Sequence, residues 1–168
     1  MKNSSSITWF LVLAHIFLSF YSCTRGVQET RLPNEDRLFS MIIASDSSEF
    51  KDSIRERVID KYRHAASIEI VNIKKLNEID PMEYDVVLII DTCLAWSGFN
   101  PALNTFLENN EQKENVVVFM TAGDPDWAYS YQGVDAITSA SVVENEDVTF
   151  KEISEQIDQI LIDKHKNA

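Results

Sequence analysis

Residues 84–123 read YDVVLIIDTCLAWSGFNPALNTFLENNEQKENVVVFMTAG and decide the fold. Two short runs rich in β-branched residues, 85–91 and 116–121, flank a polar loop and a helical segment. Both runs are almost entirely apolar, which is typical of strands buried on both faces of a parallel sheet. The stretch therefore predicts a β-α-β unit. Open α/β sheets bind ligands at the carboxyl ends of their strands, here the loops 91–100 and 121–133.

The flanking sequence predicts further alternating elements. An apolar residue recurs at every fourth position from Phe50 to Tyr62, which indicates an amphipathic helix on the sheet. Asp46 with Glu49 fits a capping box for this helix, as Thr149 with Glu152 does for the last one. Further strands are expected at 38–44, 67–73 and 134–138, and further helices at 101–108, with Asn100 as cap, and after residue 149. We expect a three-layer α/β sandwich with a five-stranded parallel sheet of order 2-1-3-4-5.

The first residues are typical of a secretory signal peptide. Residues 1–6 are polar, and residues 7–21 form an apolar run shorter than the roughly 20 residues that span a bilayer. The run ends in Ser22-Cys23, which resembles a bacterial lipobox, although Phe20 stands where leucine is usual. We expect an exported protein anchored to a bacterial membrane through a lipid on Cys23. A secreted or periplasmic protein and an uncleaved transmembrane leader remain alternatives.

The expected domain organisation follows from that leader. Residues 1–22 form the signal peptide, 23–36 a polar tether and 37–168 one domain, which is long enough to bury a core. With Cys23 lipidated, Cys93 has no intramolecular disulfide partner. The scattered histidines do not have the spacing of a zinc site, so no metal site is expected.

The charge and the motifs exclude several functions. A formal net charge of −12 argues against binding to nucleic acid or to anionic lipid, because both need a basic patch. The sequence contains no dinucleotide fingerprint, P-loop or nucleophile elbow. Acidity of this size is otherwise typical of a solvated surface.

The order of elements in residues 38–162 resembles the flavodoxin-like superfamily. The matching positions are Trp96, Gly98, Pro101, Phe106, Leu107, Thr121 and Gly123. The resemblance implies a flavodoxin-like fold and, where flavin is bound, an FMN phosphate held by the first loop and a ring held by the aromatic loops. The cofactor-binding residues implied are Ser45, Ser47, Ser48, Thr92, Trp96, Thr121, Gly123 and Trp127.

The first loop departs from the flavodoxin pattern. It has no glycine, and it places Asp46 and Glu49 where a phosphate dianion would lie. Two like charges within a few ångströms disfavour the phosphate by several kcal/mol, even at an effective dielectric near 20. We therefore expect a degenerate flavin site in a domain that binds a partner or a small ligand. The alternative is an FMN-binding electron-transfer protein.

Two residue groups have alternative interpretations. Trp96 and Trp127 either cover a planar ligand or pack the loops together and mark a partner surface. Cys93 is either a reactive thiol or a core residue. Asp91 and Thr121 also match the phosphoacceptor and threonine of receiver domains. However, the first strand lacks that family's acidic pair, and no lysine follows the fifth strand.

Overall fold

The computed structural model describes residues 26–93, 100–111, 113–123 and 128–167. Its strands are β1 (Thr30–Leu32), β2 (Phe39–Ser45), β3 (Ala66–Asn72), β4 (Val86–Thr92), β5 (Val116–Thr121), β6 (Tyr129–Tyr131) and β7 (Val134–Ser139). Its α-helices are α2 (Glu49–Tyr62), α3 (Pro101–Asn109) and α4 (Glu146–Asn167), and its 3-10 helices are η1 (Ile73–Glu78), η2 (Pro81–Glu83) and η3 (Val143–Asn145). The predicted leader and Cys23 lie outside the described residues.

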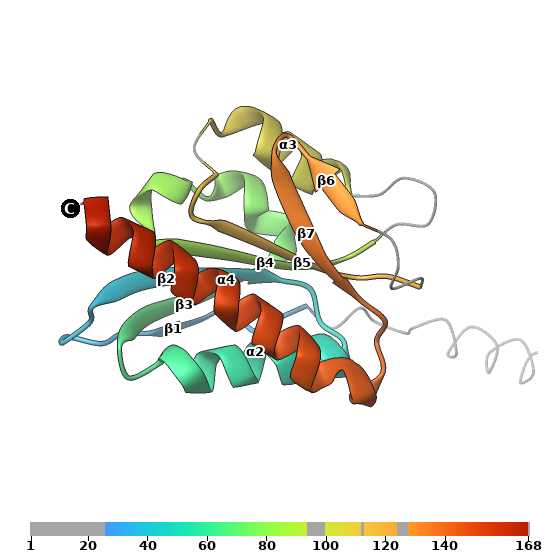
Figure 1. Ribbon diagram of the computed structural model, residues 1–168, viewed down its shortest axis with the longest axis horizontal. Helices are drawn as coiled ribbons and strands as arrows, with labels where there is room; N and C mark the ends of the chain where they lie inside the picture. Colours follow the sequence, from blue (N-terminus) through green and yellow to red (C-terminus); the bar gives the residue numbers. More distant parts are fainter. Residues whose placement is uncertain (1–25, 94–99, 112, 124–127, 168) are drawn as a thin grey trace, which may run out of the picture.

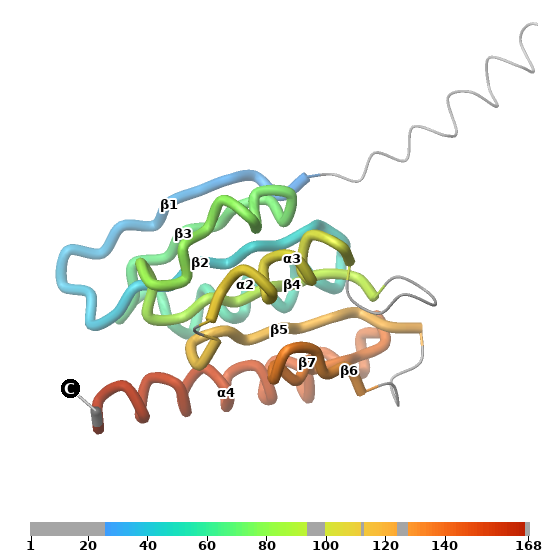
Figure 2. Tube along the Cα trace, turned by 90° about the horizontal axis from the view of Figure 1, so that it is seen from above, coloured from blue at the N-terminus to red at the C-terminus, as the bar shows by residue number. Residues whose placement is uncertain are grey.

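The strands form one mixed sheet of seven strands in the order β1-β3-β2-β4-β5-β7-β6. The five central strands, β3-β2-β4-β5-β7, are parallel, and the edge strands β1 and β6 are antiparallel to their neighbours. Figure 2 shows the strands from β1 on one side to β6 on the other. The expectation of five parallel strands therefore omitted both edges of the sheet.

Both edge strands are short, and each escaped prediction for a local reason. β1 has the sequence Thr-Arg-Leu and lies within 23–36, the range expected to be a tether. Val27, before it, is only 8% exposed, so the folded unit begins ahead of residue 37. β6 lies in the range expected to be a long loop, and Gln132 and Gly133 join it to β7 with φ of 53° and 81°. Two consecutive residues with positive φ form the tight hairpin turn that suits the twist of antiparallel strands.

Helices cover both faces of the sheet (Figure 1). α2 and α4 pack on one face, where Ile54, Val58, Ile153 and Ile157 are fully buried. α3 and η1 cover the other face through Leu103, Phe106, Leu107 and Leu76, which are also buried. The apolar stripes predicted for the first helix and for α3 are confirmed, because their residues form these two cores.

The helix starts were predicted with mixed success. Asn100 caps α3, because its Oδ1 accepts a hydrogen bond from Leu103 N at 2.9 Å, as expected. α2 is capped by Ser48 rather than by Asp46. α4 begins at Glu146, so Thr149 lies inside the helix and is 2% exposed instead of capping it. Asp46 pairs with Lys51 instead of capping α2, and Thr149 is buried instead of capping α4. The capping-box pattern in the sequence predicts neither arrangement.

Candidate functional site

Buried polar side chains gather where the parallel strands end, an edge of the sheet called here the carboxyl edge. Ser45, Asp91, Thr121 and Ser139 lie at the ends of β2, β4, β5 and β7, and each is at most 6% exposed. The parallel register places Thr92 beside Thr121, and Thr121 beside Ser139. Polar groups rarely lie buried without hydrogen bonds, so their partners decide what this edge can bind.

Lys51, in the first turn of α2, is buried at this edge and is 2% exposed. Its Nζ lies 2.5 Å and 2.6 Å from the two carboxylate oxygens of Asp46, and it also donates to Thr92 Oγ1. Thr92 Oγ1 in turn donates to Asp46 Oδ2 at 3.2 Å. We call Asp46, Lys51 and Thr92 the Lys51 cluster. Pairing of this kind compensates for the removal of a charged amine from water.

Asp91 lies next to the Lys51 cluster and is 5% exposed. Its Oδ1 accepts from Thr92 N at 2.8 Å, and its Oδ2 accepts from Asn100 Nδ2. Burial raises the pKa of Asp91 to about 6. The hydrogen bond from Thr92 opposes that rise, the Asp46 carboxylate adds to it, and the Lys51 amine reduces it. Both oxygens of Asp91 are therefore engaged, which disfavours a role as a phosphoacceptor.

The three serines predicted to hold a phosphate are engaged in hydrogen bonds within the protein. Ser45 Oγ donates to the carbonyl of Asp46 at 2.6 Å, and Ser47 Oγ donates to Asp52 Oδ2 at 2.7 Å. Ser48 Oγ accepts from the backbone amide of Lys51 at 3.4 Å. The loop is thus bonded to itself and to the first turns of α2.

The structure describes some of the other predicted site residues and not the rest. Thr121 is buried beside Thr92, whereas Gly123 is exposed. Trp96, Gly98 and Trp127 lie outside the described residues, so the interpretation that Trp96 and Trp127 cover a planar ligand stays a prediction. Cys93 is half-buried, and its Sγ donates to the Tyr129 hydroxyl at 3.0 Å. It therefore lies at the rim of the carboxyl edge, where it packs against the core on the α3 face of the sheet.

Sequence reasoning missed Lys51, although the signal was present. Lys51 precedes Ile54 by three residues and Val58 by seven, a spacing that puts all three on one face of a helix. Because Ile54 and Val58 were assigned to the buried stripe, a lysine at this position should have been expected to point inward. Its partner Asp46 lies one residue after the end of β2.

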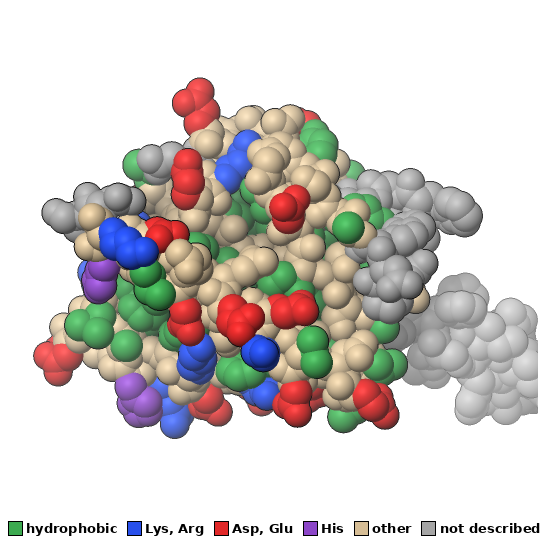
Figure 3. Space-filling view, in the orientation of Figure 1, with side chains coloured by type: hydrophobic (Ala, Val, Ile, Leu, Met, Phe, Trp, Pro, Cys, Tyr) green, Lys and Arg blue, Asp and Glu red, His purple; other side chains and the backbone are tan. Residues whose placement is uncertain are grey.

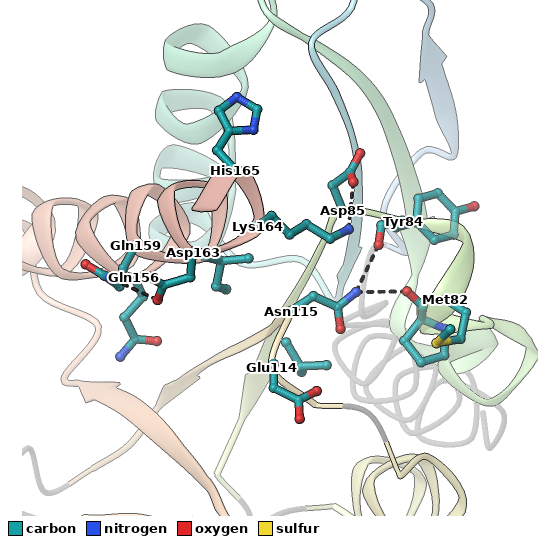
Figure 4. A pocket seen from close by; sticks show the side chains of 13 residues that line it. Met82, Tyr84, Asp85, Glu114, Asn115, Gln156, Gln159, Asp163, Lys164 and His165 are labelled. Atoms are coloured by element: carbon teal, nitrogen blue, oxygen red, sulfur yellow. Dashed lines mark hydrogen bonds and ion pairs between the residues drawn. The ribbon is translucent and has the colours of Figure 1, made fainter. Parts of the chain in front are cut away.

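A separate cavity of about 1030 Å³ lies at the opposite edge of the sheet, between the last turns of α4 and the starts of β4 and β5. Figure 4 shows Lys164 reaching from α4 to Asp85, a contact of 2.7 Å between Nζ and Oδ1. Burial acts to raise the pKa of Asp85, but hydrogen bonds from Lys164 and Ser40 outweigh it, so the pKa lies below its usual range. This cavity was not predicted from the sequence.

The distribution of charged side chains on the surface agrees with the formal charge of −12. Figure 3 shows acidic side chains spread over the face seen there, with several of them along α4. In the part of the chain that the structure describes, no group of three or more His, Cys, Asp or Glu side chains is arranged to hold a metal ion. Within the same residues, no helix is both long enough and apolar enough to cross a membrane.

Comparisons with known proteins add little to this description. The chain matches no model of a known protein family, and no curated protein matches it. Among solved structures it is similar to oxidised flavodoxin 2 from Bacillus cereus, with 16% sequence identity and a TM-score of 0.46. The similarity covers 71% of this chain and 98% of that one. A likeness of this size does not identify a family or a ligand.

Proposed function

We propose that the chain is an exported, lipid-anchored domain of the flavodoxin-like kind with a degenerate flavin site. Its carboxyl edge binds a protein partner or a small ligand. The observation that carries the proposal is the Lys51 cluster, which occupies the loop where a flavin phosphate would lie. No catalytic residue is assigned.

The charges of the first loop support this proposal. The side chain of Lys51 is 3% exposed, whereas that of Asp46 is 33% exposed, so the carboxylate and not the amine faces an approaching phosphate. A pair of like unit charges 4 Å apart repel by about 4 kcal/mol at an effective dielectric of 20. The N-terminus of a helix attracts an anion by only about 0.3–1 kcal/mol. The Lys51 amine, 2.5 Å from the Asp46 carboxylate, offsets part of this repulsion, and the remainder opposes the attraction of the helix N-terminus.

The hydroxyl groups of the loop support it as well. A phosphate would need donors from Ser45, Ser47 and Ser48, but the hydroxyls of Ser45 and Ser47 already donate to Asp46 and Asp52. Ser48 caps α2. Binding through Ser45 and Ser47 would therefore require their hydrogen bonds to break, at about 1 kcal/mol each. Ser48 only accepts in capping α2, so its O–H can still donate.

An FMN-binding electron-transfer protein is the second candidate. One observation favours it: the serine-rich loop lies at the N-terminus of α2, which is a common place for phosphate groups. In that case the ring would lie near Trp96 and Trp127. Under the preferred proposal the same aromatic loops contact the partner or ligand instead.

Titration with FMN distinguishes the two candidates. The domain is purified from residue 25 onward, and flavin fluorescence is followed as protein is added. We expect no quenching at high micromolar FMN. The variant Asp46→Asn removes the partly exposed carboxylate, and Glu49→Gln, at the exposed first residue of α2, is the matched control. Tight binding by the unaltered domain, with quenched fluorescence, would establish the FMN-binding alternative and contradict the proposal.

The lipid anchor is tested separately by Cys23→Ser in the full chain. We expect the unaltered protein in the membrane fraction and the variant in the soluble fraction, because the lipid on Cys23 is the proposed attachment. Persistence of the variant in the membrane fraction would show that an uncleaved leader holds the protein there. The binding role of the domain does not depend on that result.

A further inference from the structure

The part of the chain that the structure describes begins at the carboxyl edge of the sheet. Gly26 packs so closely on Asn72, the last residue of β3, that a Cβ on Gly26 would lie 2.8 Å from Asn72 Nδ2. Val27 follows and is 8% exposed. β1 then runs away from this edge, because it is antiparallel to β3 (Figure 2). Gly26, called here the entry point, is therefore fixed at this edge.

This entry point limits the distance between the folded domain and a lipid on Cys23. Cys23 precedes Gly26 by three residues, which span at most about 10 Å when fully extended. A tether over the whole range 23–36 would have reached about 45 Å. Because β1 and Val27 belong to the fold, only residues 23–26 separate a lipid on Cys23 from the domain. This segment, called here the leash, is several times shorter than the tether expected from the sequence. This step rests on the lipid anchor of the proposed function.

Exposed apolar side chains lie at the same edge. Val142 and Val143 are 45% and 76% exposed, and Val148, in the first turns of α4, is 60% exposed. They follow the end of β7, on the side of the molecule where β1 begins (Figure 1). Four strand spacings separate β3 from β7, so the valines lie about 20 Å along the edge from Asn72. The leash therefore joins the domain at the β3 end of the carboxyl edge, and the valines lie at its β7 end.

We propose that the carboxyl edge faces the membrane that holds the anchor, with Val142 and Val143 in contact with a zwitterionic lipid surface. Transfer of apolar side chains from water to the interface favours this orientation. The formal charge of −12 disfavours an anionic surface. Of the acidic residues beside the valines, Asp147 is paired with Arg57 at 2.8 Å and Glu146 accepts from Ser53 Oγ at 2.8 Å, whereas Glu144 is exposed. A partner or ligand of the carboxyl edge is then one that the membrane presents.

Fluorescence quenching in the full, anchored chain tests the orientation. An environment-sensitive fluorophore is attached at Val143→Cys or, as the matched control, at Met82→Cys in a Cys93→Ser background. Met82 is 64% exposed and lies at the opposite edge of the sheet. The protein is reconstituted into phosphatidylcholine vesicles that contain nitroxide-labelled phosphatidylcholine. We expect quenching several-fold stronger at position 143 than at position 82, and weaker quenching at 143 when Val142→Ser is added.

Each outcome separates the orientation from the anchor. If the protein sediments with the vesicles but both positions are quenched equally, the orientation is wrong and the anchor stands. If it does not sediment, the anchor is wrong and the orientation falls with it. Insertion of ten Gly and Ser residues after Thr24 lengthens the leash. Selective quenching at position 143 should then decrease, and unchanged selectivity would show that the leash does not set the orientation.

Discussion

Replacing Asp91 with Asn should make the stability of the protein less dependent on pH. Burial raises the pKa of Asp91 to about 6 in the folded protein, from its ordinary value of 3.8. A carboxyl group with a raised folded pKa contributes stability that is fully present below pH 3.8 and is lost as pH rises through about 6. Ionised Asp91 therefore destabilises the folded state at neutral pH, and the Asn variant lacks this effect.

The magnitude follows from the shift. About two pKa units correspond to about 3 kcal/mol over the whole titration, and to about 2 kcal/mol between about pH 4.5 and about pH 7.5. The side chain is 5% exposed, so solvent screening reduces this value little. For a chain of this size, each kcal/mol changes Tm by about 2–4 °C.

The assay is urea unfolding of the unaltered domain and of Asp91→Asn across that pH range. Asn at position 91 also changes the hydrogen bonds with Thr92 and Asn100, but that offset does not depend on pH. The informative quantity is therefore the difference in unfolding free energy between the two proteins, which should shift by about 2 kcal/mol in favour of the variant as pH rises. Asp135→Asn, at an exposed position of β7, is the control. A difference that stays constant with pH would refute the reasoning.

Three further predictions test the Lys51 cluster, the end of α4 and the β6–β7 hairpin. Asp46→Ala leaves the buried Lys51 amine without its charged partner and should lower the free energy of unfolding in urea by about 3–5 kcal/mol. Lys51→Met leaves only a partly exposed carboxylate, so an equal or greater loss in that variant would contradict the argument from burial. Lys164→Met should move the midpoint of acid unfolding to higher pH. Asp85 has a lowered pKa in the folded state, so its carboxylate stabilises the fold above pH 3.8 and loses that effect as pH falls. An unchanged midpoint would count against a stabilising role for the Lys164–Asp85 ion pair. Gly133→Ala, at φ of +81°, should destabilise by about 1–2 kcal/mol and speed amide exchange in β6, whereas unaltered exchange would show that the turn tolerates a Cβ.

The buried parts of the fold could be read from local patterns. Val116–Thr121 was placed to the residue, because a run of β-branched residues between polar loops fits a strand buried on both faces. Asn100 and Pro101 marked the start of α3, since a capping side chain and a proline at the first helical position act within one turn. Patterns of this kind depend on neighbours within a few residues.

The edges of the sheet could not be read in that way. β1 is three residues long and only partly apolar, and it is a strand because β3 presents a row of backbone groups beside it. β6 depends likewise on its hairpin partner β7. Short edge strands carry little periodicity of their own, so pairing across the sheet decides them. For the same reason, the range 23–36 was expected to be a tether, although Val27 is buried and β1 pairs with β3 within it.

For the candidate site, the sequence by itself placed Ser45, Asp91 and Thr121 at the carboxyl edge, because strand ends follow from the hydrophobic pattern, but it did not place Lys51 there. It also indicated that Asp46 would disfavour a phosphate. Only the tertiary structure decided how those residues pair: Lys51 turns inward to Asp46 and Thr92, and Asp91 bonds to Asn100. The physical reason is that burial and charge pairing depend on side chains from separate elements, Thr92 being 41 residues from Lys51 along the chain.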